Sequence, residues 1–189
     1  MRKIVFVAIA FLALVAAQSC QNKKTAPVIG IADSTAVDED QEPDSTLYGV
    51  CGEGTGMHSL QFIADSGDTL TVLIPDDDTA AVQGGLLCGD RLAVIADKTA
   101  DGDLLAKKVI NLTSLLGKWT SIDKNFDIVE GGEVVNNVKA ETNPWTTWKI
   151  VNGKLLLNKD TFAIDVLGPD SLLLENNQGI YAFKRQTKD

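Results

Sequence analysis

Few residues in this chain have the type and spacing that nucleophilic catalysis requires. Cys51 is followed seven positions later by His58, the single histidine, and Cys88 lies further along the chain. A cysteine nucleophile needs an adjacent base to take its proton. His58 would have to be that base, but the residues between it and Cys51 indicate a loop, and no second histidine is available. We therefore expect no catalytic thiol.

Acidic residues are more numerous, and they define the alternative function. Acids such as Glu53, Asp65 and Glu130 are of the residue type that many hydrolases use as a pair of carboxylates. None of them stands at a spacing that forces such a pair, and two acids occur in almost every chain. We predict a protein that is not an enzyme, with an envelope hydrolase that uses a carboxylate pair as the alternative.

Two acidic segments have the composition of cation sites. One runs from Asp97 to Asp103, but an EF-hand loop beginning there would need a glutamate at its twelfth position, which is Lys108. The Asp101-Gly102 pair inside this segment is typical of a hairpin turn, in which glycine supplies a positive φ. The other segment, 76–78, is interpreted as a solvated turn, with a weak cation site as the alternative. We predict neither a metal nor a cofactor.

The N-terminus has the pattern of an export signal. Residues 1–3 are a short basic start, and Ile4–Ala17 is an unbroken apolar run that leads through Gln18 and Ser19 to Cys20. Fourteen apolar residues are too few to cross ~30 Å of hydrocarbon comfortably, but they suit a signal peptide. Small residues before a cysteine resemble the lipobox of bacterial lipoproteins.

This resemblance implies that residues 1–19 are removed as a signal peptide and that Cys20 carries the lipid anchor. A lipoprotein cysteine holds three acyl chains, and each buried methylene contributes ~0.8 kcal/mol to membrane binding. Gln21, not aspartate, follows the cysteine, which by resemblance to Gram-negative sorting implies the outer membrane of a bacterial cell envelope. The alternative is an ordinary secretory signal cut nearby, which would leave Cys20 as an unmodified thiol.

Charge excludes one class of partner and predicts a tether. The net charge is −9, with −6 on residues 45–112 and −1 on residues 113–189. No basic patch is left for a phosphate backbone, so we expect no nucleic acid as a partner. Between Ala32 and Ser45 the chain has six acids and no base. Such a stretch cannot bury enough apolar surface to offset its ordering entropy, so residues 20–45 are predicted to be a flexible tether.

Residues 46–112 are predicted to form five short β-strands, because apolar and polar residues alternate between turn signals. A single helical turn is expected at 79–83. The expected strands are 46–52, 60–64, 70–74, 91–97 and 104–112. Five strands with a break after the third resemble the oligonucleotide/oligosaccharide-binding barrel, the OB-fold. A barrel face that binds single-stranded nucleic acid needs basic and aromatic residues. This acidic segment has only Tyr48 and Phe62 as aromatics. It is therefore interpreted as a spacer or a protein-binding barrel.

Cys51 and Cys88 are the two cysteines that follow Cys20. Outside the inner membrane such a pair can be oxidised. A disulfide here would close a loop of about 36 residues and would stabilise the fold by roughly 3–4 kcal/mol on the chain-entropy model. The first and fourth strands of an OB-like barrel are neighbours, which makes the pairing geometrically reasonable. Two buried free thiols are the alternative.

The last third of the chain has a more specific motif. Gly117-Lys118-Trp119 resembles the Gly-x-Trp signature that opens lipocalins, in which a short helical turn leads into the first strand and the tryptophan closes the barrel floor. Short strands follow one another to residue 184, and 151–154 is a strong type I′ hairpin signal. Together they make about eight strands, the number that closes an up-and-down barrel. The resemblance covers residues 115–186, and the short strands imply a shallow cup.

Two further tryptophans are candidates for ligand contact. Trp145 and Trp148 are three residues apart in a strand expected over 145–151, so they should point to opposite faces. One would pack inward and the other could stand at the rim and stack on a ligand. Trp119, Trp145 and Trp148 are thus the candidate barrel-floor or ligand residues.

The chain is therefore predicted to be all-β, with a signal peptide and tether, an OB-like barrel over 46–112 and a lipocalin-like barrel over 113–189. The function that we predict is a lipid-anchored, non-catalytic module of the cell envelope. It would bind a small apolar ligand or an envelope protein. A filled barrel would favour a protein partner, and a hollow one would favour a ligand.

Overall fold

The structure is a computed structural model that describes residues 43–76, 78 and 80–186. The signal peptide, the lipidation site Cys20 and most of the tether lie outside these residues, so the predictions made for them stay predictions. Of the tether, Pro43–Ser45 are described. They lie against the turn at Asn152, whose side-chain oxygen accepts a hydrogen bond from the Ser45 N–H (2.8 Å).

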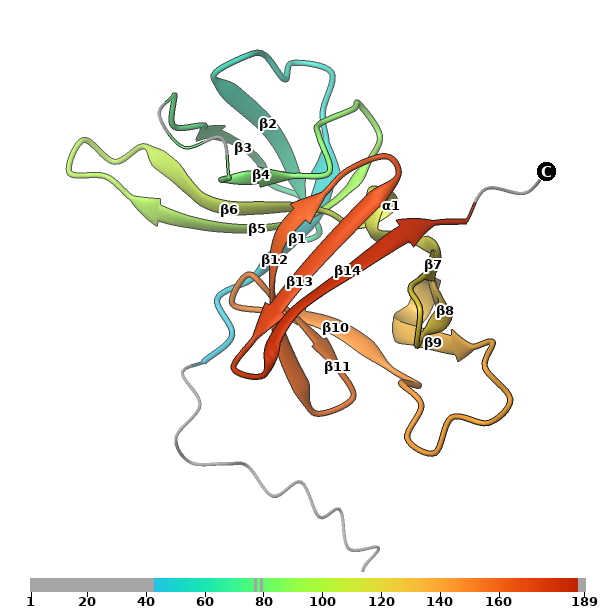
Figure 1. The fold of residues 1–189 in the computed structure, drawn as a ribbon. Helices are drawn as coiled ribbons and strands as arrows, with labels where there is room; N and C mark the ends of the chain where they lie inside the picture. Colours follow the sequence, from blue (N-terminus) through green and yellow to red (C-terminus); the bar gives the residue numbers. More distant parts are fainter. Residues whose placement is uncertain (1–42, 77, 79, 187–189) are drawn as a thin grey trace, which may run out of the picture. The chain divides into compact units, whose positions relative to one another are not determined.

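The first half of the described chain forms a closed five-stranded barrel (Figure 1). Its strands are β1 (Leu47–Cys51), β2 (Ser59–Ala64), β3 (Thr69–Leu73), β5 (Arg91–Lys98) and β6 (Leu104–Asn111). They follow the order β3-β2-β1-β5-β6, and β3 then pairs in parallel with β6 to close the barrel. The predicted OB-like barrel is confirmed, including the neighbouring positions of its first and fourth strands, β1 and β5.

The segment before β5 differs from the sequence prediction. In place of a helical turn at 79–83, Val82–Gln83 form the short strand β4, which pairs in parallel with Val109 and Ile110 of β6. The N–H of Val109 also donates to the Ala81 carbonyl (2.6 Å), and Ala81 is buried. The open edge of β6 therefore takes up the backbone of this segment, and the tertiary pairing overrides the local preference.

Two predicted turns are confirmed by their backbone angles. Asn152 and Gly153 both have positive φ, +48° and +73°, as a type I′ turn requires. Gly102 has φ +92° in the turn between β5 and β6. The acids around Gly102 thus lie in a hairpin turn, the interpretation favoured from the sequence.

The second half forms a nearly closed, antiparallel, eight-stranded barrel. The short helix α1 (Leu112–Leu115) leads into it, and the 3-10 turn η1 (Glu130–Gly132) separates its second and third strands. The strands are β7 (Gly117–Thr120), β8 (Asn125–Val129), β9 (Glu133–Asn136), β10 (Trp148–Val151), β11 (Lys154–Leu157), β12 (Asp160–Leu167), β13 (Ser171–Asn176) and β14 (Gly179–Arg185). Strands next to one another in sequence pair, except β9 and β10, which are the two ends of the sheet, and β14 pairs with β7. A single bridge from Glu133 to Thr147 nearly closes the ring. The predicted up-and-down arrangement of eight strands is confirmed.

Each barrel has its own apolar core, and the two are joined by a few apolar contacts and a buried polar residue before α1. Ala93 and Ile110 of the first barrel belong to the same cluster of buried side chains as the interior of the second. Asn111 is fully buried and donates to the Gly84 and Gly85 carbonyls (3.3 and 3.0 Å) and to Asp90 (2.6 Å). Its side-chain oxygen accepts from the backbone at the start of α1. The two halves therefore stabilise each other.

Candidate functional site

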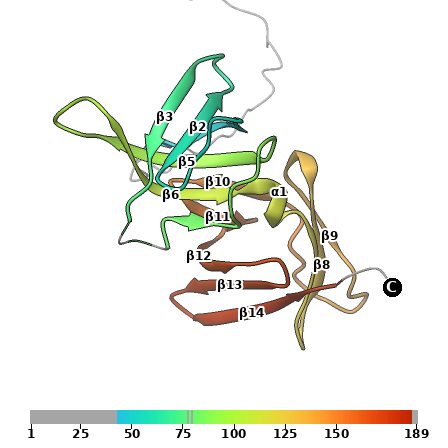
Figure 2. The same ribbon diagram turned by 90° about the horizontal axis from the view of Figure 1, so that it is seen from above.

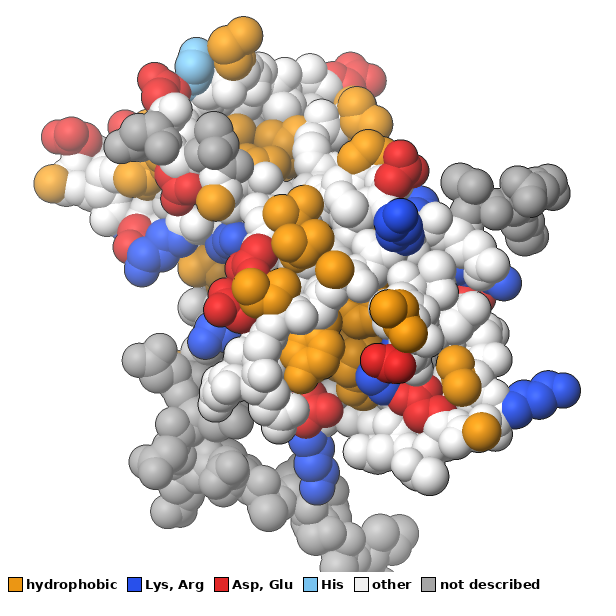
Figure 3. All heavy atoms as spheres, in the orientation of Figure 1, with side chains coloured by type: hydrophobic (Ala, Val, Ile, Leu, Met, Phe, Trp, Pro, Cys, Tyr) orange, Lys and Arg blue, Asp and Glu red, His pale blue; other side chains and the backbone are white. Residues whose placement is uncertain are grey.

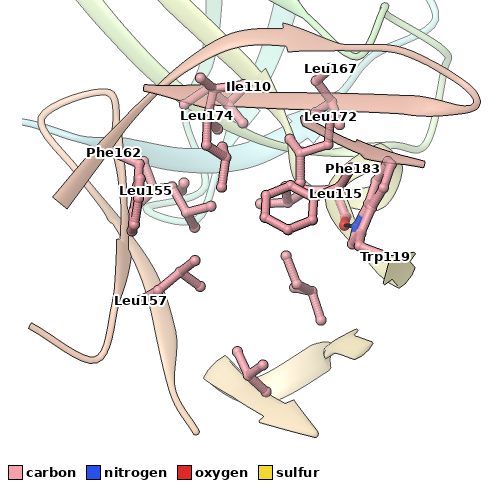
Figure 4. Close-up of a cluster of buried hydrophobic side chains, with 14 of the residues drawn as sticks. Ile110, Leu115, Trp119, Leu155, Leu157, Phe162, Leu167, Leu172, Leu174 and Phe183 are labelled. Carbon is pink, nitrogen blue, oxygen red and sulfur yellow. Dashed lines mark hydrogen bonds between the residues drawn. The ribbon is translucent and has the colours of Figure 1, made fainter. Parts of the chain in front are cut away.

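Trp119 is a structural residue held between α1 and the last strand. Its ring is fully buried, and its Nε1–H donates to the Leu115 carbonyl (2.9 Å; Figure 4). The guanidinium of Arg185 lies 4.1 Å from the ring centroid and donates to the carbonyls of Ser114 and Leu116. Every polar atom of this arrangement is used within the chain, so the geometry gives Trp119 no access to a ligand. Sequence reasoning missed Arg185 because no local pattern links it to a tryptophan 66 positions earlier.

The interior of the second barrel is packed with side chains (Figure 4). These residues come from seven of its eight strands, each is at most 3% exposed, and they form one cluster: Trp119, Phe126, Ile128, Ile150, Leu155, Leu157, Phe162, Ile164, Leu172, Leu174 and Phe183. The rings of Phe126 and Phe183 meet edge to face at 5.2 Å. This barrel has a core like that of any small domain, where a lipid-carrying barrel would have a cavity.

Trp145 borders a small polar hollow of about 270 Å³ at one end of this core. Its ring is buried against Phe126 and Phe162, with ring centroids 5.2 and 5.7 Å apart. The ammonium of Lys124 lies 4.2 Å from the ring centroid and pairs with Glu141. The chain thus places its own cation on the ring, in the position that a stacking ligand would need.

Trp148 is also tied into the fold. The strand begins only at Trp148, so Trp145 lies in the preceding loop and the period-two argument that put the two rings on opposite faces does not apply. Trp148 packs against the core cluster, and its Nε1–H donates to the Val129 carbonyl (2.7 Å). None of the three tryptophans is an exposed platform.

The two cysteines are free thiols in the structure. Cys51 is buried, with its Sγ 3.3 Å from the Thr55 hydroxyl, whereas Cys88 is exposed. The backbones nevertheless lie side by side, because the Gly89 N–H donates to the Cys51 carbonyl (2.9 Å). The structure thus brings the two segments together without the predicted disulfide. His58 is exposed and pairs with Asp76, so the structure does not join it to a thiol.

Among the acidic residues considered from the sequence, Asp65 has a partner within the fold. Asp65 accepts two hydrogen bonds from the Arg91 guanidinium (2.5 and 2.7 Å), and these hold the pKa of the Asp65 carboxyl below its ordinary value. No group of three or more His, Cys, Asp or Glu residues that could hold a metal ion is found within 43–76, 78 and 80–186. Asp65, one of the acids considered from the sequence, thus belongs to an ion pair between the β2–β3 turn and β5.

A large apolar hollow lies on the outside of the second barrel. It has a volume of about 890 Å³ and runs between the β7–β8 turn (121–124) and the outer face of β13 and β14. Ile122 is fully exposed on the turn, and Ile180 is 66% exposed on β14. Figure 3 shows apolar side chains gathered over β12–β14, where Val166 and Leu173 pair across the strands. We call this hollow the outer groove. Its sequence signal was the presence of leucine and isoleucine at outward positions, where a solvated face would carry polar residues.

Comparisons with known proteins add no relative. Scans against protein-family models, curated proteins and solved structures find no match to this chain. Within the part of the chain that is described, no helix has the length and apolar character needed to cross a bilayer.

Proposed function

We propose that this protein is a non-catalytic lipoprotein of the bacterial cell envelope that binds another protein on the outside of its second barrel. The lipid chains on Cys20 would hold it at the outer membrane, and residues 21–42 would connect the anchor to the barrels. The observation that carries the proposal is the packed interior of the second barrel beside an apolar groove on its outer surface.

The packed interior argues against a carrier of small apolar ligands. A ligand carried inside the barrel would need an internal cavity of the size typical of ligand sites, about 300–1,000 Å³, and side chains from seven strands fill that interior. To admit a fatty acid, the barrel would have to displace rings such as Phe162 and Phe183, which are nearly fully buried. A protein partner avoids this cost because it binds without opening the core.

The outer groove supports a protein partner. Large apolar side chains gathered on a surface are typical of interaction sites, and the groove carries Ile122, Leu173 and Ile180 together. Binding a partner would cover these side chains. The first barrel has only Tyr48 and Phe62 as aromatics and a charge of −6 on residues 45–112, which fits the role of a spacer or a second protein contact.

The anchor is tested by cell fractionation. Cys20→Ser removes the acceptor of the lipid, so the variant should move from the detergent phase to the soluble fraction of the envelope. Ser19→Ala, which keeps the cysteine, is the matched control and should stay with the membrane. A Cys20→Ser variant that distributes as the unmodified protein does would contradict the lipoprotein assignment.

The choice between ligand and partner is tested with palmitate below its micellar concentration. The readout is the methyl NMR signals of the purified protein, with interior Leu157 and Leu174 compared with Leu173 in the outer groove. We expect the interior signals to stay unchanged up to saturating palmitate. Saturable shifts of Leu157 and Leu174 would show that the barrel opens for a ligand, and the proposed function would then be wrong.

A further inference from the structure

Strand β14 has an edge that no described strand covers along most of its length. Seven residues form β14 and four form β7, so only Lys184 and Arg185 have partners in β7. Beyond Thr120 the chain turns back into β8, and the Ser121 N–H donates to the Lys124 carbonyl. Figure 2 shows β14 as the last strand beside β13. Residues 179–183 therefore pair with β13 alone.

The hydrogen-bond pattern shows which backbone groups are left over. The Arg185 N–H donates to the Asp170 carbonyl on the β13 side. The Gln186 N–H donates to the Lys118 carbonyl of β7 on the other side, and both donor–acceptor distances are 2.9 Å. Backbone groups of successive residues in an antiparallel strand point alternately to the two sides, and the pairing of β14 with β13 is regular. The N–H and carbonyl groups of Ile180 and Ala182 therefore face the open side.

The open edge and the outer groove are the same place. Ile180 and Ala182 line the groove from β14, and Ile122 faces them from the β7–β8 turn. The five residues 179–183 span roughly 17 Å at strand spacing. The wedge between the edge and the turn thus offers a row of backbone hydrogen-bonding groups and apolar side chains beside them.

We propose that the partner of this protein binds by adding an extended segment to the open edge of β14. This inference rests on the proposed function and specifies its binding mode. Strand addition satisfies the free backbone groups of an edge, and alternate side chains of the added segment supply specificity. Here one set of side chains would lie over Ile180 and Ile122, and the other set would face Tyr181, which is half-buried at the end of the core.

The charges in the wedge favour a segment that is uncharged where it pairs. Lys184 and Asp123 offset each other, and Lys124 is already paired with Glu141. The whole chain carries −9, which would repel an acidic partner at long range and attract a basic one. The occupant is therefore a β-prone, apolar segment of a partner protein with neutral or basic flanks.

A second copy of this chain fits the wedge less well. The two sides of the wedge are the edge of β14 and the turn at 121–124, and they converge where Lys184 pairs with Thr120. A single extended segment can enter such a wedge, whereas an entire barrel would meet the turn before its own edge reached β14. The protein should therefore be a monomer in solution, and a dimer is an outcome that the experiment below detects.

The experiment uses the purified, ¹⁵N-labelled protein and a blocked heptapeptide with a lysine at each end and alternating threonine and valine between them. In the protein alone, the amides of Ile180 and Ala182 should exchange rapidly, whereas those of Tyr181 and Phe183 should be protected by β13. Saturating peptide should slow exchange at Ile180 and Ala182 about tenfold or more. The same peptide with its central amide N-methylated should bind about tenfold more weakly, because it lacks a backbone donor.

A pair of protein variants gives the matched control. Ala182→Pro removes the N–H that faces the wedge and leaves the β13 ladder intact, and proline is tolerated on edge strands. It should weaken peptide binding about tenfold, whereas Ala182→Ser, which keeps the N–H, should bind as the unmodified protein does. The N-methylated peptide gives the same test on unmodified protein if Ala182→Pro fails to fold.

Several outcomes would overturn the inference. These are an absence of protection at Ile180 and Ala182 at saturating unmodified peptide, equal binding of the N-methylated and unmodified peptides, and protection of both amides in a concentration-dependent dimer without peptide. None of these outcomes contradicts the proposed function, which is wrong instead if palmitate shifts the interior methyl signals of Leu157 and Leu174.

Discussion

Replacing Trp119 by alanine should strongly destabilise the protein. Its side chain is fully buried. The Arg185 guanidinium lies 4.1 Å from the ring centroid, and the indole N–H donates to the Leu115 carbonyl. A buried tryptophan cut to alanine costs about 3–5 kcal/mol. Domains have about 5–15 kcal/mol in total, so Trp119→Ala should remove about a fifth or more of the stability, or prevent expression.

The assay is urea unfolding of the whole chain followed by far-ultraviolet circular dichroism, which does not depend on tryptophan emission. Trp119→Phe keeps most of the apolar contact and loses the N–H donor, so it should fall between the alanine variant and the unmodified protein. Ile122→Ala, at a fully exposed position, is the control and should stay within about 0.5 kcal/mol. If Trp119→Ala also lies within about 0.5 kcal/mol, the structural role given to Trp119 is wrong.

Three further predictions concern the rest of the fold. Asn111→Ala should cost about 2 kcal/mol or more in urea unfolding, because buried carbonyls and the α1 cap lose their partner; an unchanged midpoint would contradict the polar link. Arg91 holds the pKa of Asp65 below its ordinary 3.8, so the pair's contribution, at most about 1 kcal/mol for exposed groups, is present above pH ~4 and lost as the pH falls through the folded pKa. The stability difference between the protein and Asp65→Asn should therefore shrink below pH ~4, and a constant difference would oppose this. With iodoacetamide and no reductant, Cys88 should react in the native protein and Cys51 only after unfolding. If neither cysteine reacts in denaturant, the two form a disulfide.

Much of the fold could be predicted because its signals are local. Alternating apolar residues and turn residues identify strands without knowledge of their partners, and the Asn152-Gly153 pair has the positive φ angles that its sequence predicts. The count of eight strands in the second barrel follows from the same pattern. β4 could not be found in this way, because two residues become a strand only where the edge of β6 accepts them.

The candidate site was less predictable because it depends on contacts between distant residues. The sequence pattern predicts a strand over 145–151, but Trp145 follows Pro144 and lies in a loop. There Lys124 from another turn covers its ring. The open edge at residues 179–183 exists because β7 is shorter than β14. Neither fact follows from the sequence of one segment, since each needs the pairing register of two.

The most direct test of external binding is photocross-linking in intact cells, with a photoreactive amino acid in place of Leu173 in the outer groove or in place of Ile63 on the first barrel. Both positions are on strands and partly exposed, and both variants should be anchored normally. The account predicts a discrete protein adduct from position 173, lost in the Ala182→Pro background, and none from position 63. Equal adducts from the two positions, or none from position 173, would contradict it.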